Sequence, residues 1–244
     1  MGTIVIPGLQ RLIADRQRFG FKKACAGLLY RGAQRLVKLR INEMMERPLD
    51  GINLLEVSPS ISNLRFRALT SADVRRFAAD PSYEFDATMP GRLEAGHDWC
   101  FAAFSGDRLV NYSWYALGSI ESRHCHVALS FPANTVYMYK ALTRPEYRGA
   151  GVHRATFVHA ARYLAQLALE RVVLIIEHAN WHSRRSHQRL GFRTLGFIAT
   201  AGRGTCRFER HPRVPAEFGL RFGIDADLSR RLAGRGTGFD ALNE

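Results

Sequence analysis

A glycine-containing loop near the middle of the chain has the residue types that bind anions. The stretch 143–153, with the sequence TRPEYRGAGVH, lies between a strand-like run that ends at Leu142 and a helix-like run that begins near Arg154. Gly149 and Gly151 allow the backbone to turn tightly and leave its amides uncovered, while the following helix directs its positive end toward the same place. Phosphate and pyrophosphate are the anions most often held this way, so the loop predicts a nucleotide-derived cofactor.

A single Gly-x-Gly is weak evidence, because turns between strands and helices also use glycine for steric reasons. A second signal follows in the next part of the chain. The run 172–176 predicts a buried strand, and 180–192 predicts a helix that is capped by Asn180 and closed by Gly191.

Together these features resemble the GNAT superfamily of N-acyltransferases. Three motifs carry the resemblance. Arg148-x-x-Gly151 follows a strand and precedes a long helix, Asn180 begins a second, shorter helix, and Leu190-Gly191-Phe192 ends that second helix. The resemblance covers residues 63 to about 212. It implies an α/β (α+β) fold with a mixed, mostly antiparallel sheet flanked by helices, in which two central parallel strands, 136–142 and 172–177, splay apart.

The resemblance also implies the cofactor, acetyl-CoA or another acyl-CoA, and the residues that hold it. Backbone groups at the splay would hold the pantetheine arm, and the amides of the glycine loop would hold the pyrophosphate. His153 departs from the family, which usually has Gly or Ala there, so cofactor affinity is in doubt; its ring could shield the phosphates or meet the adenosine 3′-phosphate. The expected cofactor-binding residues are Leu142, Thr143, Arg148, Gly149, Ala150, Gly151, Val152, His153, Asn180 and Ser183.

Catalysis in such a site is mostly placement of a neutral amine against a thioester, with proton transfers as smaller contributions. His187 stands four residues before Gly191, where many relatives carry a tyrosine that protonates the leaving thiolate, so it is the expected general acid. The alternative is a solvent-facing helix residue. Glu177 is the expected general base, with His178 and Tyr139 as the other candidates.

The remaining elements follow from hydrophobic periodicity and turn signals. The run 136–142 alternates, which places Tyr137, Tyr139 and Ala141 on one face and Met138, Lys140 and Leu142 on the other. Residues 80–98 have no lasting period and are expected to cover the acceptor site. The other expected elements are a strand at 64–68, a helix capped at 70–73, an antiparallel hairpin at 99–115, a helix at 154–170 and strands at 193–200 and 203–210.

The chain divides into an extension (1–60), an acyltransferase domain (61–212) and a partly mobile tail (213–244). Residues 9–47 have apolar residues at helical spacing interleaved with lysine and arginine, which favours a helix with an apolar stripe and a basic face, broken near Gly20 and again near Gly27 or Gly32. This helix would pack on the domain or on a second subunit in a homodimer, lie on an anionic membrane surface such as the inner membrane, or dock an acidic carrier protein or nucleic acid.

Composition limits the function classes. In a chain of 244 residues that are 46% apolar, no run approaches the roughly 18 apolar residues of a membrane span, so a cytoplasmic protein is expected. His124 and His126 share one face of a strand but lack an identifiable third ligand, so no metal is expected. The net charge of +13 is explained in part by a phosphate-rich cofactor, and no nucleic-acid-binding motif accompanies it.

Three functions remain from these observations. The simplest is transfer of an acetyl group from acetyl-CoA to the primary amine of a small molecule. The second keeps the fold but takes a long acyl chain from acyl carrier protein, which suits the basic extension and the basic cofactor half of the chain. The third, a non-catalytic basic binding module, depends on charge alone.

Overall fold

The computed structural model describes residues 16–17, 20–37, 39–52, 61–96, 98–122, 127–201, 208–211 and 213–222. The helices are α2 (Phe21–Val37), α3 (Ser71–Phe77), α4 (Met89–Glu94), α5 (Val152–Gln166) and α6 (Trp181–Arg189). The strands are β1 (Arg40–Pro48), β2 (Arg65–Ala68), β3 (Asp98–Ser105), β4 (Arg108–Leu117), β5 (Ser119–Ser122), β6 (Val127–Ser130), β7 (Thr135–Thr143), β8 (Arg171–Glu177), β9 (Arg193–Ala201), β10 (Phe208–Arg210) and β11 (Gly219–Phe222).

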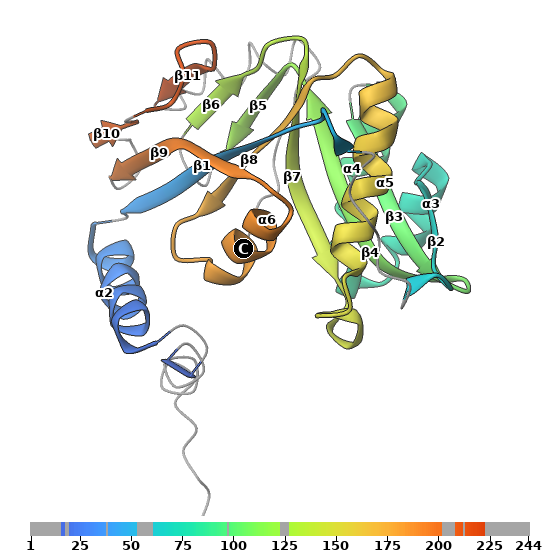
Figure 1. The fold of residues 1–244 in the computed structure, drawn as a ribbon, viewed down its shortest axis with the longest axis horizontal. Helices are drawn as coiled ribbons and strands as arrows, with labels where there is room; N and C mark the ends of the chain where they lie inside the picture. Colours follow the sequence, from blue (N-terminus) through green and yellow to red (C-terminus); the bar gives the residue numbers. More distant parts are fainter. Residues whose placement is uncertain are drawn as a thin grey trace, which may run out of the picture.

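Eight strands form one sheet, in the order β10-β9-β1-β8-β7-β4-β3-β2. All neighbouring pairs are antiparallel except β7 and β8, which are parallel. Helices α5 and α6 cover one face, while α3, α4 and a small sheet of β11, β6 and β5 cover the other (Figure 1). The predicted fold class, a mixed and mostly antiparallel sheet with two central parallel strands and flanking helices, is confirmed.

The two parallel strands separate partway along their length. Their pairing runs only from Thr135 opposite Arg171 to Tyr137 opposite Val173, although the strands continue to Thr143 and Glu177. Each strand keeps its antiparallel neighbour on the other side over this length, β4 for β7 and β1 for β8. The backbone groups that face the gap therefore have no ladder partner, and the predicted splay is confirmed.

The faces of β7 differ from the strict alternation expected from the sequence. Trp114 of β4 pairs with Lys140 and Tyr115 pairs with Met138, so Tyr139 is an extra residue in a β-bulge. Beyond the bulge the alternation shifts by one position, and Leu142 packs against the same core cluster as Tyr137 and Tyr139. The expectation that Lys140 and Leu142 face away from these tyrosines is wrong, because a bulge leaves no signal in the period of the sequence.

The segment 40–48 corrects the prediction for the N-terminal extension. A helix broken near Gly20 and again near Gly27 or Gly32 was expected over 9–47, but α2 continues through both Gly27 and Gly32 and ends at Val37. Strand β1 then lies between β8 and β9, with a ladder on each side. Met44 and Met45 are fully buried, and they join the cores on opposite faces of the sheet. The strand lacks the apolar–polar alternation of a half-buried strand, because Glu43 and Glu46 are buried and paired with arginines of other elements, which explains why helical spacing was favoured there.

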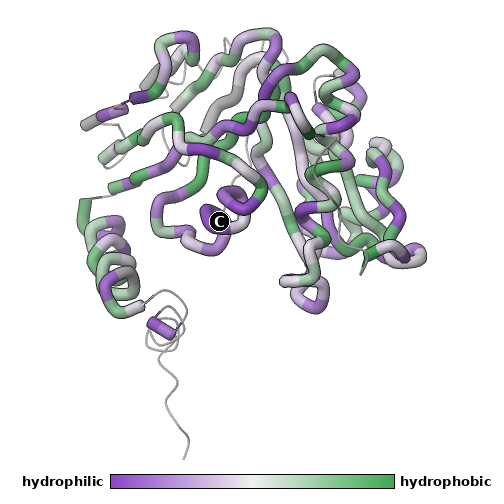
Figure 2. The backbone as a smooth tube through the Cα atoms, in the orientation of Figure 1, coloured by the Kyte–Doolittle hydropathy of each residue, from purple (hydrophilic) through white to green (hydrophobic). Residues whose placement is uncertain are grey.

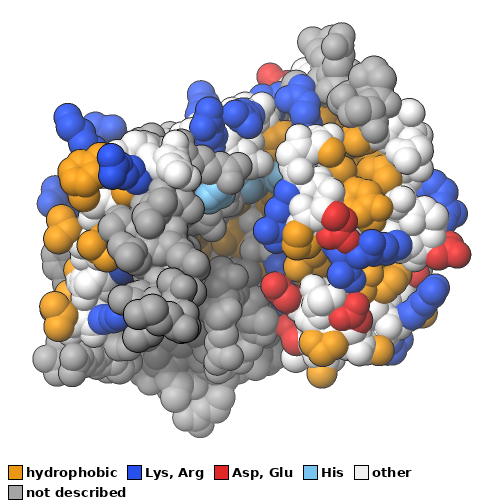
Figure 3. All heavy atoms as spheres, turned by 90° about the horizontal axis from the view of Figure 1, so that it is seen from below, with side chains coloured by type: hydrophobic (Ala, Val, Ile, Leu, Met, Phe, Trp, Pro, Cys, Tyr) orange, Lys and Arg blue, Asp and Glu red, His pale blue; other side chains and the backbone are white. Residues whose placement is uncertain are grey.

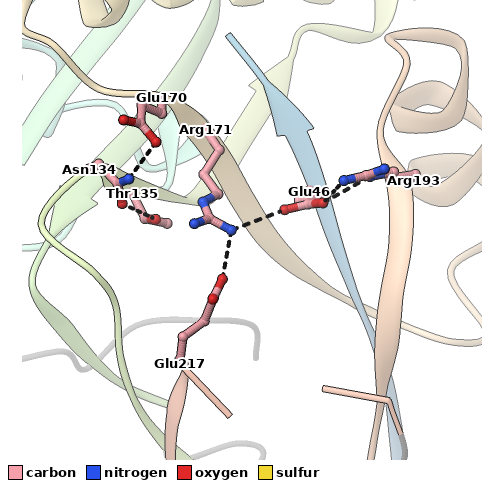
Figure 4. Close-up of polar contacts among 7 residues, drawn as sticks. All are labelled: Glu46, Asn134, Thr135, Glu170, Arg171, Arg193 and Glu217. Carbon is pink, nitrogen blue, oxygen red and sulfur yellow. Dashed lines mark hydrogen bonds and ion pairs between the residues drawn. The ribbon is translucent and has the colours of Figure 1, made fainter. Parts of the chain in front are cut away.

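Charged residues fix the C-terminal end of β1, as Figure 4 shows. Glu46 is buried and accepts hydrogen bonds from Nε and Nη2 of Arg193 at 2.8 and 2.6 Å. Arg171 Nη1 lies 3.7 Å from the other Glu46 oxygen and 2.7 Å from Glu217 Oε1. Breaking a buried pair leaves an uncompensated charge, so this network holds β1 in register with β8 and β9.

Two further expectations bear on the ends of the domain. No strand was predicted in the C-terminal tail from 213, which was expected to be partly mobile, but β11 pairs with β6 from Gly219 opposite Ser130 to Phe222 opposite Val127. Its short length and lack of period explain why it was missed. The candidate pair His124 and His126, the first residues of the predicted N-terminal helix and most of the predicted mobile tail lie outside the described residues.

Replacing Met44 by alanine tests whether β1 belongs to the core. The substitution should lower the free energy of unfolding by about 2–4 kcal/mol, because it opens a cavity at a site with no exposed surface. The matched control, Leu29→Ala on the exposed side of α2, should change it by less than about 0.5 kcal/mol. Urea unfolding of both variants measures this. Equal small effects would contradict the placement of β1.

Candidate active site

The glycine loop leads from β7 into α5 at the open end of the splay. A short 3-10 turn, Pro145–Tyr147, precedes the two glycines of the loop, and both Gly149 and Gly151 have φ of +83°. Nothing lies within 4 Å of the position that a Cβ would take at either glycine, so backbone conformation alone requires glycine there. Gly151 caps α5, whose first amides have no acceptors within the helix. The loop thus fits an anion held by main-chain groups.

One amide of the predicted cradle is already used. Arg148 donates its backbone N–H to the carbonyl of Pro145 at 3.2 Å, so its amide is not available for phosphate. Its guanidinium Nε donates to the carbonyl of Thr143 at 3.0 Å and ties the loop to the end of β7. The structure therefore favours Gly149 to His153 as the anion-binding part of the loop, with Arg148 shaping it.

Asn111, which sequence reasoning missed, fixes the point where β7 ends. This fully buried side chain donates from Nδ2 to the Leu142 carbonyl and to Thr143 Oγ1, both at 2.7 Å. Its Oδ1 has no hydrogen-bond partner in the described part of the chain. A buried polar residue within an otherwise apolar strand was the signal that could have identified it. Asn111 orients two of the residues expected at the cofactor arm.

Helix α6 is fixed to the sheet by its own cap and by an ion pair with β1. Asn180 accepts a hydrogen bond from the Ser183 backbone N–H at 3.1 Å, which confirms the predicted cap. Arg184 pairs with the buried carboxylate of Glu43, and Thr194 donates its hydroxyl to the same carboxylate. Strand β1 therefore positions the helix that carries Asn180, Ser183 and His187.

The loop and α6 meet through two histidines that are distant in sequence. The rings of His153 and His187 lie 5.2 Å apart between centroids in an edge-to-face arrangement, and Arg154 Nη1 donates to the Arg189 carbonyl at 3.4 Å. The structure thus brings together the N-terminal end of α5 and α6. These are the two halves that carry the expected cofactor and catalytic residues.

The hydrogen bonds and burial of His187 differ from those expected of a proton donor. Its Nδ1–H donates to the Ser183 carbonyl at 2.8 Å, and its Nε2 is buried without a partner among the described residues. Burial lowers the pKa of His187 to about 4 and that of His153 to about 3, where the neighbouring His187 lowers it further. Both rings are therefore neutral at pH 7. A neutral His187 whose only proton is donated to a carbonyl is poorly suited to protonate a thiolate.

The three candidate bases have different surroundings. Glu177 accepts a hydrogen bond from Gln34 of α2 and lies 3.8 Å from Arg40 Nη1, so its carboxylate anchors α2. Tyr139 donates its hydroxyl to Asp98 at 2.9 Å, and burial raises its pKa further above the usual range. His178 is half-buried, its pKa is lowered by burial and by Arg184, and its Nδ1 has no partner in the described ranges.

The segment expected to cover the acceptor site packs on the face of the sheet opposite α5. Tyr112 donates its hydroxyl to the Tyr83 carbonyl at 2.6 Å, and Lys140 Nζ donates to the Glu84 carbonyl at 2.5 Å. Burial lowers the pKa of Lys140, partly offset by Glu84. This segment is thereby attached to β4 and to β7 just beyond the bulge.

Two kinds of feature are absent from the described part of the chain. No group of three or more His, Cys, Asp and Glu side chains among these residues could hold a metal ion. None of the described helices is both long enough and apolar enough to cross a membrane.

Comparison with known proteins agrees with this geometry. Residues 66–192 match the model of the acetyltransferase (GNAT) family. The fold and this match together define the chain as a transferase of the acyl-transferring class. The chain belongs to the GNAT acetyltransferase family. No curated protein sequence matches the chain.

Solved structures with a similar arrangement have low sequence identity. A GNAT-family acetyltransferase of Novosphingobium aromaticivorans is 19% identical with a TM-score of 0.47, over 68% of this chain and 66% of that protein. The aminoglycoside N-acetyltransferase AAC(6′)-Iy in complex with CoA is 18% identical with a TM-score of 0.43, over 53% and 91%. An aminoglycoside acetyltransferase from an uncultured soil sample is 11% identical with a TM-score of 0.41, over 52% and 87%.

The buried state of His187 predicts a pH dependence of stability. Because its pKa in the folded protein is below the usual value of about 6.5, the unfolded chain binds more protons between about pH 6.5 and about pH 4. Its contribution to stability is therefore full above about pH 6.5 and is lost as the pH falls through this window. In His187→Asn, where the amide can still donate to the Ser183 carbonyl, the decline should be shallower. Urea unfolding across the window measures both slopes, and equal slopes would contradict the neutral buried state.

Proposed function

We propose that the chain is an N-acyltransferase that moves an acyl group, most simply acetyl, from a CoA thioester to the primary amine of a small-molecule acceptor. The observation that carries the proposal is the splay of β7 and β8 beyond Tyr137 and Val173, with the glycine loop at its open end. Membership in the GNAT acetyltransferase family supports it.

The residues of the loop fit the phosphate part of an acyl-CoA. We propose that the amides from Gly149 to His153 bind the pyrophosphate, and that the unpaired backbone groups of β7 and β8 hydrogen-bond to the amides of the pantetheine arm. The thioester supplies an acyl group that is already reactive toward an amine. Asn111 contributes by holding the Leu142 carbonyl and the Thr143 hydroxyl at the end of β7. The neutral His153 would shield the phosphates rather than pair with them as a cation.

Proton removal from the acceptor amine is assigned to His178 in preference to Glu177. Both residues stand at the end of β8, beyond the pairing with β7. The carboxylate of Glu177 is engaged by Gln34 and Arg40. The half-buried ring of His178 packs against Trp181 and Phe197, is neutral at pH 7, and has an Nδ1 without a partner in the described residues. A neutral imidazole can accept a proton from an ammonium group. Proton return to the thiolate is left to solvent, because the single proton of the neutral His187 ring is donated to the Ser183 carbonyl.

A second candidate function keeps the same fold and replaces the donor by acyl carrier protein. The basic excess favours it: residues 1–60 carry 10 Lys and Arg against 5 Asp and Glu, and residues 141–200 carry 9 against 3. An acidic carrier would be attracted to such a surface. Turnover with acetyl-CoA but not with an acyl carrier thioester would exclude this alternative, and the reverse result would establish it.

Gly151→Ala tests the loop as a cofactor site. Alanine at φ of +83° is strained by roughly 1–2 kcal/mol, and the loop should relax away from the conformation that presents its amides. Acetyl-CoA should stabilise the variant against heat less than it stabilises the natural chain, with an increase in Kd of about tenfold.

The matched control is Gly118→Ala, another open glycine at positive φ, which lies between β4 and β5. It should lower stability to a similar extent but leave the response to acetyl-CoA unchanged. Equal Kd values for Gly151→Ala and Gly118→Ala would contradict the assignment of the loop.

Paired substitutions at the end of β8 test the general base. His178→Asn should lower kcat/KM by about 10²–10⁴-fold and remove the fall in rate at low pH that reports titration of the base. Glu177→Gln should keep both the rate and the shape of the pH profile within a few-fold, because its role is to anchor α2. A pH–rate profile for each variant decides this, and the opposite pattern would return the role to Glu177.

A further inference from the structure

Helix α2 has an inner face that attaches it to the end of the sheet. Ala24 is buried, and the Tyr30 hydroxyl accepts a hydrogen bond from the Ile41 backbone N–H at 2.8 Å. Burial raises the pKa of Tyr30 to about 12, so the hydroxyl stays protonated. Gln34 donates its side-chain amide to Glu177 at the end of β8. Tyr30 and Gln34 lie on one side of the helix, and the side opposite them is outermost.

The outer face of α2 is apolar and open to solvent. The exposed fractions are 67% for Phe21, 75% for Leu29 and 71% for Leu36, and Leu28 is also exposed. With 3.6 residues per turn, positions 21, 28, 29 and 36 lie along one side of the helix, opposite Tyr30 and Gln34. Hydrophobic and hydrophilic positions are interleaved along α2 in Figure 2. Large apolar side chains exposed together mark a binding surface.

Charge identifies what this outer face of α2 is suited to bind. Within α2 there are four basic residues, Lys22, Lys23, Arg31 and Arg35, and no acidic residue. In the helical projection Lys22 and Arg35 flank the apolar side, and basic and apolar side chains occur together at the left edge of Figure 3, where α2 lies. A second copy would present the same positive charge and be repelled, whereas an anionic surface is complementary.

We infer that the outer face of α2 binds an anionic phospholipid surface. The helix lies in the plane of the headgroups, with Phe21, Leu29 and Leu36 inserted among the acyl chains and with Lys22 and Arg35 at the level of the phosphates. Since α2 is attached to Glu177, the lipid surface lies beside the end of β8, one of the two splayed strands. Lipid binding requires no acyl transfer, so this inference and the proposed function fail separately.

Vesicle co-sedimentation of the full chain tests the inference. The protein should sediment with vesicles of phosphatidylcholine mixed with phosphatidylglycerol, and much less with phosphatidylcholine alone or at high salt. The double variant Phe21→Gln with Leu29→Gln should lose at least about tenfold in vesicle affinity. Because both side chains are largely exposed, its unfolding free energy should stay within about 0.5 kcal/mol of the natural chain. The control Leu167→Gln removes an exposed leucine from the end of α5 and should leave vesicle binding unchanged.

Three results would overturn the inference. The first is that the natural chain does not bind the mixed vesicles. The second is that the double variant binds them as well as the natural chain does. Alternatively, sedimentation velocity would show a dimer that the double variant converts to a monomer without any vesicle binding, which would assign the outer face of α2 to a second copy.

Discussion

The structure depends on the end of the β7 and β8 ladder at Tyr137 and Val173. Beyond this point each strand retains one antiparallel neighbour, β4 or β1, and loses the other. Backbone N–H and C=O groups on the inner edges are therefore left without ladder partners in the middle of a sheet, where unpaired groups are costly. A ligand arm that carries its own amides satisfies them. In the proposed function, the gap between two otherwise intact halves of the sheet is the place where the pantetheine arm would bind.

Other features hold this gap in place from both sides. On the β7 side, the bulge at Tyr139 and the hydrogen bonds of Asn111 fix the path into the glycine loop. On the β8 side, β1 supplies a continuous ladder and the buried Glu43 that holds α6 through Arg184. The contact between His153 and His187 then joins the two sides below the gap. Residues of β1, in the N-terminal segment of the chain, thus help to position the elements around the site.

Much of this arrangement could be predicted from the sequence, and the exceptions have physical causes. The glycine loop, the Asn180 cap and the two central strands depend on local chemistry, which local sequence reports directly. The position of β1 could not be predicted because its partners, β8 and β9, lie more than a hundred residues away. The residue type at His187 suggested acid chemistry, but its burial and its bond to the Ser183 carbonyl are tertiary properties that set its protonation state.

The most direct test of the central claim is hydrogen exchange of the backbone amides, measured by mass spectrometry with and without CoA. The account predicts that CoA slows exchange in two separate peptides, one covering the end of β7 and the glycine loop to His153 and one covering the end of β8. Exchange in α3 and in the strands distant from the gap should stay unchanged. Protection confined to other regions, or no protection at saturating CoA, would contradict the claim that the gap between β7 and β8 binds the cofactor.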